Sequence, residues 1–208
     1  MASALAATIV SYLFGAIPIG LLVGRAHGID DIRKYGSGNI GASNVLRLLG
    51  AKLGLTVWLL DALKGYVPVA LAMHVLGVEG WWLAAVAVAA IAGHCFSPYL
   101  RFTGGKGVST SLGVIIGLDW RAGLICFGLW IVIVALTRYI SLGSMIGSGM
   151  AAPVLWLLRQ EAPVILAGGL IGALVIERHR SNIQRLLTGT ERRIGQREQV
   201  TPQHGEQP

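Results

Sequence analysis

The stretch MASALAATIVSYLFGAIPIGLLVGRAHG, residues 1–28, contains an apolar run from Ala2 to Gly24. This run is too long for the hydrophobic core of a secretory signal, which takes about 7–15 residues, and no cationic segment precedes it. A helix needs about 20 predominantly apolar residues to cross a bilayer. The stretch therefore predicts a retained first membrane span.

The composition of the whole chain extends this prediction. Of the 208 residues, 54% are hydrophobic and only 13% are charged, and the mean hydropathy is +0.66. Soluble domains carry about 25% charged residues, and glycine makes up about 7% of them, whereas this chain has 29 glycines. Low charge, frequent glycine and long apolar runs predict an all-α, polytopic membrane protein without an attached soluble domain.

Seven apolar segments can be drawn along the chain, at about 3–24, 53–76, 80–98, 108–118, 122–137, 140–158 and 163–177. The fourth is the shortest, and it can span only with its flanks or behind the shelter of its neighbours. We predict seven transmembrane helices in a domain that covers residues 1–188. The polar tail, residues 189–208, is predicted to be cytoplasmic and partly disordered.

The positions of Lys and Arg predict the orientation of these spans. The loops at 25–52 and 94–107, the turn near Arg138 and the tail from Arg178 hold 5, 2, 1 and 6 cations, 14 of the 17 in the chain. The opposite side keeps Arg121 and Arg159, and Lys64 lies within a span. The positive-inside rule places the cation-rich side in the cytoplasm, with the N-terminus outside and the C-terminus inside. This clustering accounts for the net charge of +7 without a nucleic-acid partner.

Small residues recur four positions apart in several of the apolar segments. Such pairs let helices approach closely in a bilayer, where the lipid supplies no hydrophobic drive for association. The pairs are Gly20/Gly24, Gly50/Gly54, Gly113/Gly117, Gly143/Gly147 and Gly168/Gly172. We interpret these glycines as packing residues.

Three polar clusters share the predicted cytoplasmic side. They are YGSGNIGASNVLRLLG at 35–50, GHCFSPYLRFTGGKGVSTSLG at 93–113 and ERHRSNIQRLLTGTERRIG at 177–195. Each combines cations with amide or hydroxyl side chains. Because one site can be assembled only from groups that share a compartment, we expect the three clusters to contribute to a common site.

Two phosphate-binding motifs can be tested against these clusters, and both fail. The G-x-G-x-x-G at 36–41 follows no strand and lies in no βαβ unit, and a Walker A loop would need glycine in place of Leu100 and Ser or Thr in place of Gly107. Backbone N–H groups in glycine-rich turns, together with a helix N-terminus, can still hold an anion. Lys106 would then add a point charge, and Arg47 a planar fork for phosphate oxygens.

Structural roles are open for several of these residues. Arg47 and Lys106 are also compatible with anchors that reach towards the membrane boundary, although an anchor does not require the glycines around Lys106. His94 and Cys95 lack further metal ligands at suitable spacing, so we expect no metal. Cys95 and Cys126 form no CxxC pattern, and we expect no disulfide.

Two pairs of residues stand one helical turn apart. His179 and Asn182 can face the same site. Asp61 and Lys64, inside an apolar span, can pair with each other, which lowers the cost of burying either charge. The second pair is as compatible with a structural role as with a functional one.

The three clusters together resemble the motifs of the bacterial membrane glycerol-3-phosphate acyltransferases that use acyl phosphate, the PlsY family. The stretches GSGNIGASNVLR, GHCFSPYLRFTGGKGVSTSLG and HRSNIQRLLTGTERRIG carry the resemblance, which covers nearly the whole chain apart from the tail. Two departures concern fine substrate positioning. Ser43 stands where the family often has Thr, and Ser97-Pro98 replaces a more usual Pro-containing run.

The resemblance implies transfer of a fatty acyl group from acyl phosphate to the 1-hydroxyl of glycerol 3-phosphate, giving lysophosphatidic acid and phosphate in bacterial phospholipid synthesis. It implies an active site at the cytoplasmic face of the inner membrane, with no metal, no cofactor, and no need for acyl-CoA or acyl carrier protein as donor. His179, Lys106 and Asn182 are the implied catalytic residues. Substrate binding is assigned to Ser37, Gly38, Asn39, Gly41, Asn44, Arg47, Gly104, Gly105, Lys106, Gly107, Ser144, His179 and Asn182.

The acyltransferase dyad of His followed five residues later by Asp is missing, because Tyr99 stands at that distance from His94 and Ile32 from His27. Acyl phosphate is already activated, so orientation and charge stabilisation are the main tasks for the protein. In the family, a phosphate oxygen of the substrate is thought to accept the hydroxyl proton. His179 is the alternative base, or it positions the substrate by a hydrogen bond.

Two other classes of function fit the sequence less well. A small transporter for a phosphorylated solute would suit the intramembrane Asp61 and Lys64, but it predicts inverted repeats and polar groups near the midplane. No repeat is visible, and the polar clusters share one face. A metal-dependent head-group transferase would need several intramembrane carboxylates, and only Asp61 is available.

Overall fold

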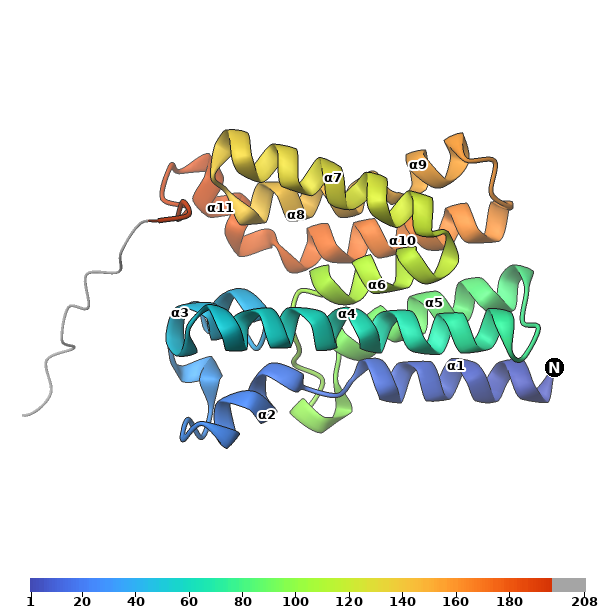
Figure 1. Cartoon of the computed structure of the whole chain (residues 1–208), viewed down its shortest axis with the longest axis horizontal. Coiled ribbons are helices and arrows are strands. Elements are labelled where there is room, and N and C mark those ends of the chain that lie inside the picture. The colour runs from blue at the N-terminus through green and yellow to red at the C-terminus, as the bar shows by residue number, and fades with distance from the viewer. Residues whose placement is uncertain (196–208) are drawn as a thin grey trace, which may run out of the picture.

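The computed structural model describes residues 1–195, and within them it consists of helices and turns without strands. Figure 1 shows the helices running side by side along the long axis of the molecule. The α-helices are α1 (Ala2–Gly15), α2 (Ile19–Ala26), α3 (Ala42–Leu49), α4 (Ala51–His74), α5 (Gly80–Cys95), α6 (Val108–Leu118), α7 (Trp120–Thr137), α8 (Ile140–Gly149), α9 (Ala151–Leu157), α10 (Ala162–Arg178) and α11 (Arg180–Leu187). Short 3-10 helices cover Ile32–Lys34 and Pro98–Leu100.

All seven predicted apolar segments are helical, but their lengths differ. Within the described residues, five stretches are long and apolar enough to cross a membrane: Ala2–Ala26, Ala51–His74, Gly80–Leu100, Trp120–Thr137 and Ile140–Leu157. The pair α10 and α11, bent by 60°, is a sixth candidate. The fourth predicted segment, α6, is a short apolar helix that packs against α4, α5 and α7. Figure 1 shows it between α4 and α10, which fits the expectation that its neighbours shield it.

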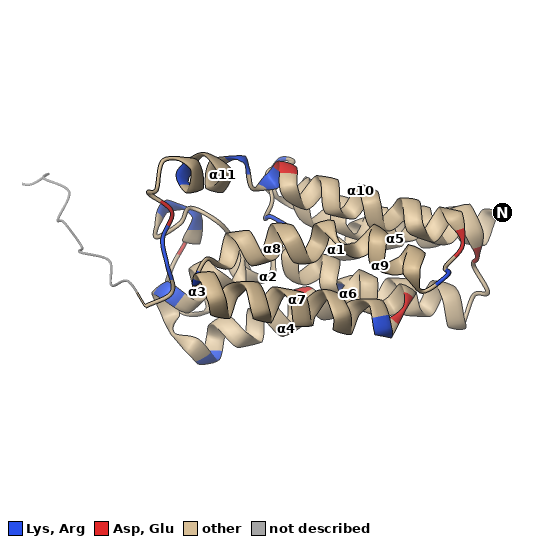
Figure 2. Ribbon diagram, turned by 90° about the horizontal axis from the view of Figure 1, so that it is seen from above, with Lys and Arg blue, Asp and Glu red and all other residues tan. Residues whose placement is uncertain are grey.

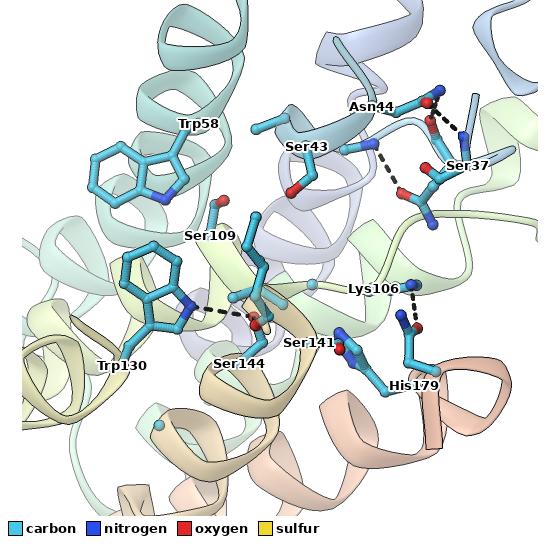
Figure 3. Close-up of a pocket in the computed structure, with 18 of the residues that line it drawn as sticks. Ser37, Ser43, Asn44, Trp58, Lys106, Ser109, Trp130, Ser141, Ser144 and His179 are labelled. Carbon is cyan, nitrogen blue, oxygen red and sulfur yellow. Dashed lines mark hydrogen bonds between the residues drawn. The ribbon is translucent and has the colours of Figure 1, made fainter. Parts of the chain in front are cut away.

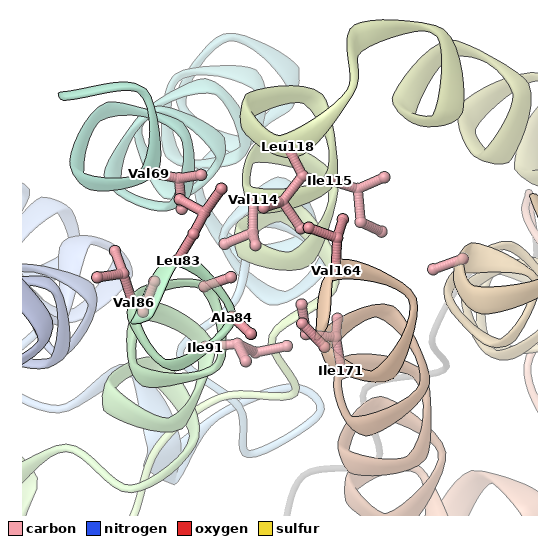
Figure 4. Packing of buried hydrophobic residues seen from close by; sticks show 14 of the residues in the cluster. Val69, Leu83, Ala84, Val86, Ile91, Val114, Ile115, Leu118, Val164 and Ile171 are labelled. Atoms are coloured by element: carbon pink, nitrogen blue, oxygen red, sulfur yellow. The ribbon is translucent and has the colours of Figure 1, made fainter. Parts of the chain in front are cut away.

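The core forms where α4, α5, α6 and α10 meet. Figure 4 shows Val69, Ile91, Val114 and Ile171 from these four helices pointing towards one another, and each is fully buried. Close packing in lipid requires small residues. A Cβ on Gly113 would lie 1.8 Å from the carbonyl oxygen of Ala62, so α6 can approach α4 only with glycine there.

The first span is broken at Pro18, between α1 and α2, and buried side chains bind the carbonyl groups that the break frees. Ser97 Oγ donates to the Ala16 carbonyl, and Lys64 Nζ donates to the Ile17 carbonyl, both at 2.7 Å. Lys64 also lies 2.7 Å from Asp61 Oδ1, which confirms the expected pairing of these two charges. Both side chains are almost fully buried, so the pair removes two isolated charges from the apolar interior.

The charged residues gather at the two ends of the bundle. Figure 2 shows most Lys and Arg at the end that carries α2, α3 and α11, and only a few charges at the other end. The loops between α2 and α3 and between α5 and α6, the α7–α8 turn and the segment after α10 all lie at this cation-rich end. Residues 189–195, the beginning of the predicted tail, fold back to the cation-rich end of the bundle. The Ile194 N–H donates to the Arg138 carbonyl at 2.8 Å. Residues 196–208 lie outside the described residues.

Candidate functional site

The first cluster forms a loop that is organised by Asn44, in the first turn of α3. Its side chain is 1% exposed. Oδ1 accepts from the Ser37 N–H at 2.8 Å, and Nδ2 lies 3.1, 3.2 and 2.8 Å from the carbonyl oxygens of Ile32, Tyr35 and Asn39. Asn44 borders the cavity described below, but its polar atoms are used inside the loop. These bonds make Asn44 a support of the loop that presents Ser37, and its contact with substrate stays a prediction.

The backbone amides of this loop are also largely engaged. The Gly38 N–H donates to the Tyr35 carbonyl at 3.1 Å, and the Gly41 N–H donates to Asn39 Oδ1 at 2.8 Å. Each of these two amides already has a partner within the loop, and the contact of Gly38 and Gly41 with substrate stays a prediction. Gly38 has φ +69°, a conformation in which a side chain would be strained, so it shapes the turn.

In the second cluster, Lys106 follows a loop that is held from two sides. A Cβ on Gly104 would lie 2.0 Å from the His94 carbonyl oxygen, and the Gly105 N–H donates to that oxygen at 3.1 Å. From the other side, the Arg178 guanidinium donates to the carbonyls of Gly104 and Gly105 at 3.0 and 3.2 Å. These two glycines line neither cavity and fix the path of the chain into Lys106, and their contact with substrate stays a prediction.

The third cluster supplies His179 and Asn182, on either side of the start of α11. His179, just beyond the α10 span, is 3% exposed, and its Nδ1 lies 2.7 Å from the Val175 carbonyl. Burial lowers the pKa of His179 to about 4, with the Lys106 charge adding to the effect, so the ring is neutral at neutral pH. Since a carbonyl only accepts, Nδ1 carries the proton and Nε2 is left as an acceptor.

Asn182 joins the second and third clusters. Its Oδ1 accepts a hydrogen bond from Lys106 Nζ, and its Nδ2 donates to Glu191 Oε1 at 2.7 Å. Glu191 also accepts from Ser141 Oγ at 2.6 Å and from Arg185 Nε at 2.8 Å. Burial tends to raise the pKa of Glu191, but the hydrogen bonds from Ser141, Asn182 and Arg185 lower it below its ordinary value, so the carboxylate is ionised.

The three clusters surround one cavity of about 1080 Å³. Figure 3 shows Ser37, Lys106, Ser144 and His179 facing its interior from different elements. The predicted residues that line it are Ser37, Asn39, Gly41, Asn44, Arg47, Lys106, Gly107, Ser144, His179 and Asn182. A smaller adjoining cavity of about 330 Å³ shares Lys106 and is bordered by Arg178, Arg180 and Arg185.

Helix N-termini add partial positive charge to the cavity. The first turns of α3, α6 and α8 each place a serine at the second helical position, Ser43, Ser109 and Ser141, and all three line the cavity. Amides in a first turn have no partner inside their own helix, and the helix dipole favours an anion there. The arrangement is suited to more than one phosphoryl group.

Burial and neighbouring cations disfavour the protonated form of Lys106. Burial, together with the charges of Arg185, Arg47 and Arg178, lowers the pKa of Lys106 to about 8, against the opposing effect of Glu191. A bound phosphate would relieve this crowding of positive charge, because an anion stabilises the protonated amine. The crowding of positive charge around Lys106 therefore favours an anion-binding role over that of a membrane-boundary anchor.

The cavity continues into an apolar branch between α4, α6 and α7. Trp58 and Phe127 have ring centroids 5.7 Å apart, and Phe127 and Trp130 stack at the same separation. Trp130 Nε1 donates to Ser144 Oγ at 3.3 Å, so the aromatic wall begins beside the polar part of the site. Ile115 lines the branch further into the bundle. One cavity thus offers a cationic part and a lipid-like part.

Sequence reasoning did not assign Glu191, Arg185, Ser109 or Ser141. The serines could have been found by noting that each stands two residues into an apolar helix that follows a loop. Glu191 lay within the third cluster, but its role depends on Ser141, 50 residues away. That contact is not visible in the sequence.

The fold and the site define an integral membrane protein whose cavity suits phosphorylated ligands with an apolar portion. The chain belongs to the glycerol-3-phosphate acyltransferase family, whose model matches residues 5–189. It is 48% identical over 195 residues to the glycerol-3-phosphate acyltransferase of Geobacter sulfurreducens, covering 93% of this chain and 99% of the relative. The glycerol-3-phosphate acyltransferase of Rubrobacter xylanophilus is 46% identical over 189 residues, covering 91% of this chain and 94% of the relative.

Solved structures agree with this assignment. The glycerol 3-phosphate form of PlsY (YgiH), an integral membrane glycerol 3-phosphate acyltransferase, superposes with a TM-score of 0.89 at 41% identity, covering 93% of this chain and 96% of that one. The lysophosphatidic acid form gives a TM-score of 0.87 at 40% identity with the same coverage. The resemblance inferred from the three motifs is confirmed.

Proposed function

We propose that this enzyme transfers a fatty acyl group from acyl phosphate to the 1-hydroxyl of glycerol 3-phosphate, and releases lysophosphatidic acid and inorganic phosphate. The observation that carries the proposal is the joining of a cationic, serine-rich part and an apolar branch in one cavity. Both phosphoryl groups belong in the first part and the acyl chain in the second. The bound forms named for the related crystal structures, glycerol 3-phosphate and lysophosphatidic acid, are the proposed acceptor and product.

The cations and amides of the site are suited to a donor that is already activated. The 1-hydroxyl oxygen attacks the acyl carbonyl carbon, the bond between that carbon and the phosphate oxygen breaks, and phosphate leaves with the electron pair. Phosphate is a good leaving group that needs no general acid. The protein then has to align the two substrates and stabilise negative charge, which positioned cations and amides do well.

We assign the grip on the glycerol 3-phosphate phosphate to Ser37, Arg47 and Lys106. Arg47 offers a planar fork and Lys106 a point charge, and both suit phosphate oxygens. Asn182 orients Lys106 through their hydrogen bond. The first turns of α6 and α8, with Ser144 one turn further on, are assigned to the acyl-phosphate head.

The hydroxyl proton has two proposed acceptors. A phosphate oxygen of the substrate can take it directly. His179 can take it at Nε2, since Nδ1 is committed to the Val175 carbonyl. The low pKa of His179 makes it a weak base, which favours the phosphate oxygen as acceptor and His179 as a hydrogen-bond acceptor that orients the hydroxyl.

We propose that α6 completes a set of seven spans, with the N-terminus outside and the site at the cytoplasmic face of the bacterial inner membrane. The clustering of cations at one end of the bundle supports this orientation under the positive-inside rule. A cytoplasmic substrate would then reach Lys106 without crossing the bilayer. A reporter protein that is active only in the cytoplasm should therefore be active when it is fused to the C-terminus.

The donor is tested with purified enzyme in detergent. Glycerol 3-phosphate is supplied with acyl phosphate, acyl-CoA or an acyl carrier protein thioester, in the presence of a metal chelator. We expect equal amounts of phosphate and lysophosphatidic acid from acyl phosphate, and no product from the other two donors. Turnover with acyl-CoA alone would refute the donor assignment.

The grip on phosphate is tested in parallel by Lys106→Ala. This variant should lose turnover while remaining folded and extractable. Lys52→Ala is the matched control, because Lys52 is exposed at the start of α4 and does not line either cavity. Near-normal activity of Lys106→Ala would return Lys106 to an anchoring role.

A further inference from the structure

A second group of polar residues reaches the cavity from inside the membrane bundle. Asp61 on α4 and His94 near the end of α5 both line the cavity. Their side chains are 4% exposed each, and Lys64, which pairs with Asp61, is 3% exposed. The proposed reaction uses none of the three.

Lys64 accounts for only part of this group. It neutralises Asp61 and binds the carbonyl freed at the break between α1 and α2. His94 has no such task, because its Nδ1 has no hydrogen-bond partner within the part of the chain that the structure describes. That atom lies 3.9 Å from Asp61 Oδ1, one small side-chain movement away from a hydrogen bond.

The other side of the His94 ring supports the lysine loop. A Cβ on Gly105 would lie 2.1 Å from His94 Nε2, so the loop backbone rests directly on the imidazole. The Gly105 N–H also donates to the backbone carbonyl of His94. Lys106 is the next residue, so a shift of the His94 ring moves the root of the Lys106 side chain.

We propose that His94, oriented by Asp61, is a positioning residue that sets the place of Lys106 for phosphate binding. The ring forms the inner face of a clamp whose outer face is Arg178. Asp61 Oδ1 faces the Nδ1 edge of the ring at 3.9 Å, and Gly105 rests on the Nε2 edge. The inference rests on the proposed function, in which Lys106 grips the phosphate of glycerol 3-phosphate.

The consequence is a selective loss of phosphate affinity. Without the ring, the loop can settle towards α5, and Lys106 loses its alignment with Asn182. Misplacement of a positioned group by about 1 Å can cost on the order of a hundredfold in rate or affinity. The aromatic wall of the apolar branch belongs to α4 and α7, whereas His94 belongs to α5, so the KM for the acyl donor should be unchanged.

The test measures glycerol 3-phosphate binding by calorimetry without any donor, and then KM and kcat with the donor that supports turnover. His94→Ala should weaken glycerol 3-phosphate binding at least about tenfold, raise its KM to the same extent and leave the KM for the acyl donor unchanged. Ser11→Ala is the matched control: Ser11 is fully buried and donates to the Val86 carbonyl between α1 and α5, away from the loop. The affinity of the Ser11→Ala enzyme for glycerol 3-phosphate should match that of the unaltered enzyme.

A double-mutant cycle separates positioning from a general loss of packing. Asp61→Asn should weaken binding in the unaltered enzyme but add nothing in the His94→Ala background, because Asp61 acts through His94. Should His94→Ala fail to fold, His94→Asn carries the same expectation, since it keeps a donor towards Asp61 but removes the ring edge beneath Gly105. Unchanged affinity in the folded His94 variant, or full additivity in the cycle, would overturn the inference. If the unaltered enzyme itself bound no glycerol 3-phosphate, the proposed function would fall first and the inference with it.

Discussion

Replacing Asn44 by alanine should unfold the first loop and weaken the whole protein. The substitution leaves the Ser37 N–H and the carbonyls of Ile32, Tyr35 and Asn39 without this partner. A buried polar group without a partner costs about 1–3 kcal/mol. Taking the low value for the three partly buried contacts and a somewhat higher one for the Ile32 contact gives about 4 kcal/mol. For a chain of this size that corresponds to a fall in Tm of about 10 °C.

The assay is thermal unfolding of the purified protein in detergent, with two comparison variants. Asn39→Ala removes one hydrogen bond, to the Gly41 N–H, and should lower Tm by only about 3 °C. Asn44→Asp keeps the acceptor for the Ser37 N–H but sets a carboxylate against carbonyl oxygens, so it should be at least as harmful as alanine. Equal Tm values for Asn44→Ala and Asn39→Ala, or a neutral Asn44→Asp, would contradict the loop-organising role.

Three further predictions concern the site and the packing. The value of kcat/KM for glycerol 3-phosphate should fall as the pH rises past about 8, because Lys106 is cationic below its pKa and neutral above it; in Lys106→Arg this fall should be absent from the pH profile. Gly113→Ala should lower the yield of folded protein on size-exclusion chromatography, since its Cβ would strike the Ala62 carbonyl, whereas Gly128→Ala, with nothing within 4 Å, should elute like the unaltered protein. Glu191→Gln should lower the stability measured by thermal unfolding by about 1–2 kcal/mol, because it removes the charge from the hydrogen bonds that this carboxylate accepts; an unchanged Tm would show that the charge is not needed there.

The acyl donor and the catalytic roles remain proposals, but several local features were predictable. The pairing of Asp61 with Lys64 could be predicted from their spacing of one helical turn, because a nearby opposite charge lowers the free-energy cost of burying either one. Lys106 could be singled out because glycines on both sides are not needed by a membrane anchor. The shielding of the segment at 108–118 could be expected from its length alone.

Other features were beyond the reach of the sequence. The loop-supporting role of Asn44 was not predictable, because its four partners depend on the fold of the loop. Gly104 and Gly105 are predicted phosphate ligands, and their close contact with His94 and Arg178 is a second reason for glycine that only the structure shows. A glycine that approaches a ligand and one that approaches a side chain look the same in a sequence.

The sequence by itself determined that this chain is a bundle of apolar helices and that most of its cations share one end. Hydrophobicity and charge act segment by segment, and the bilayer responds to each run through its length and flanking residues. Only the tertiary structure decided which groups meet: Lys106 with Asn182, 76 positions apart, and Ser141 with Glu191. Such contacts depend on how all the helices pack together, because a hydrogen bond forms only at a distance of about 3 Å and no local pattern in the chain fixes that distance.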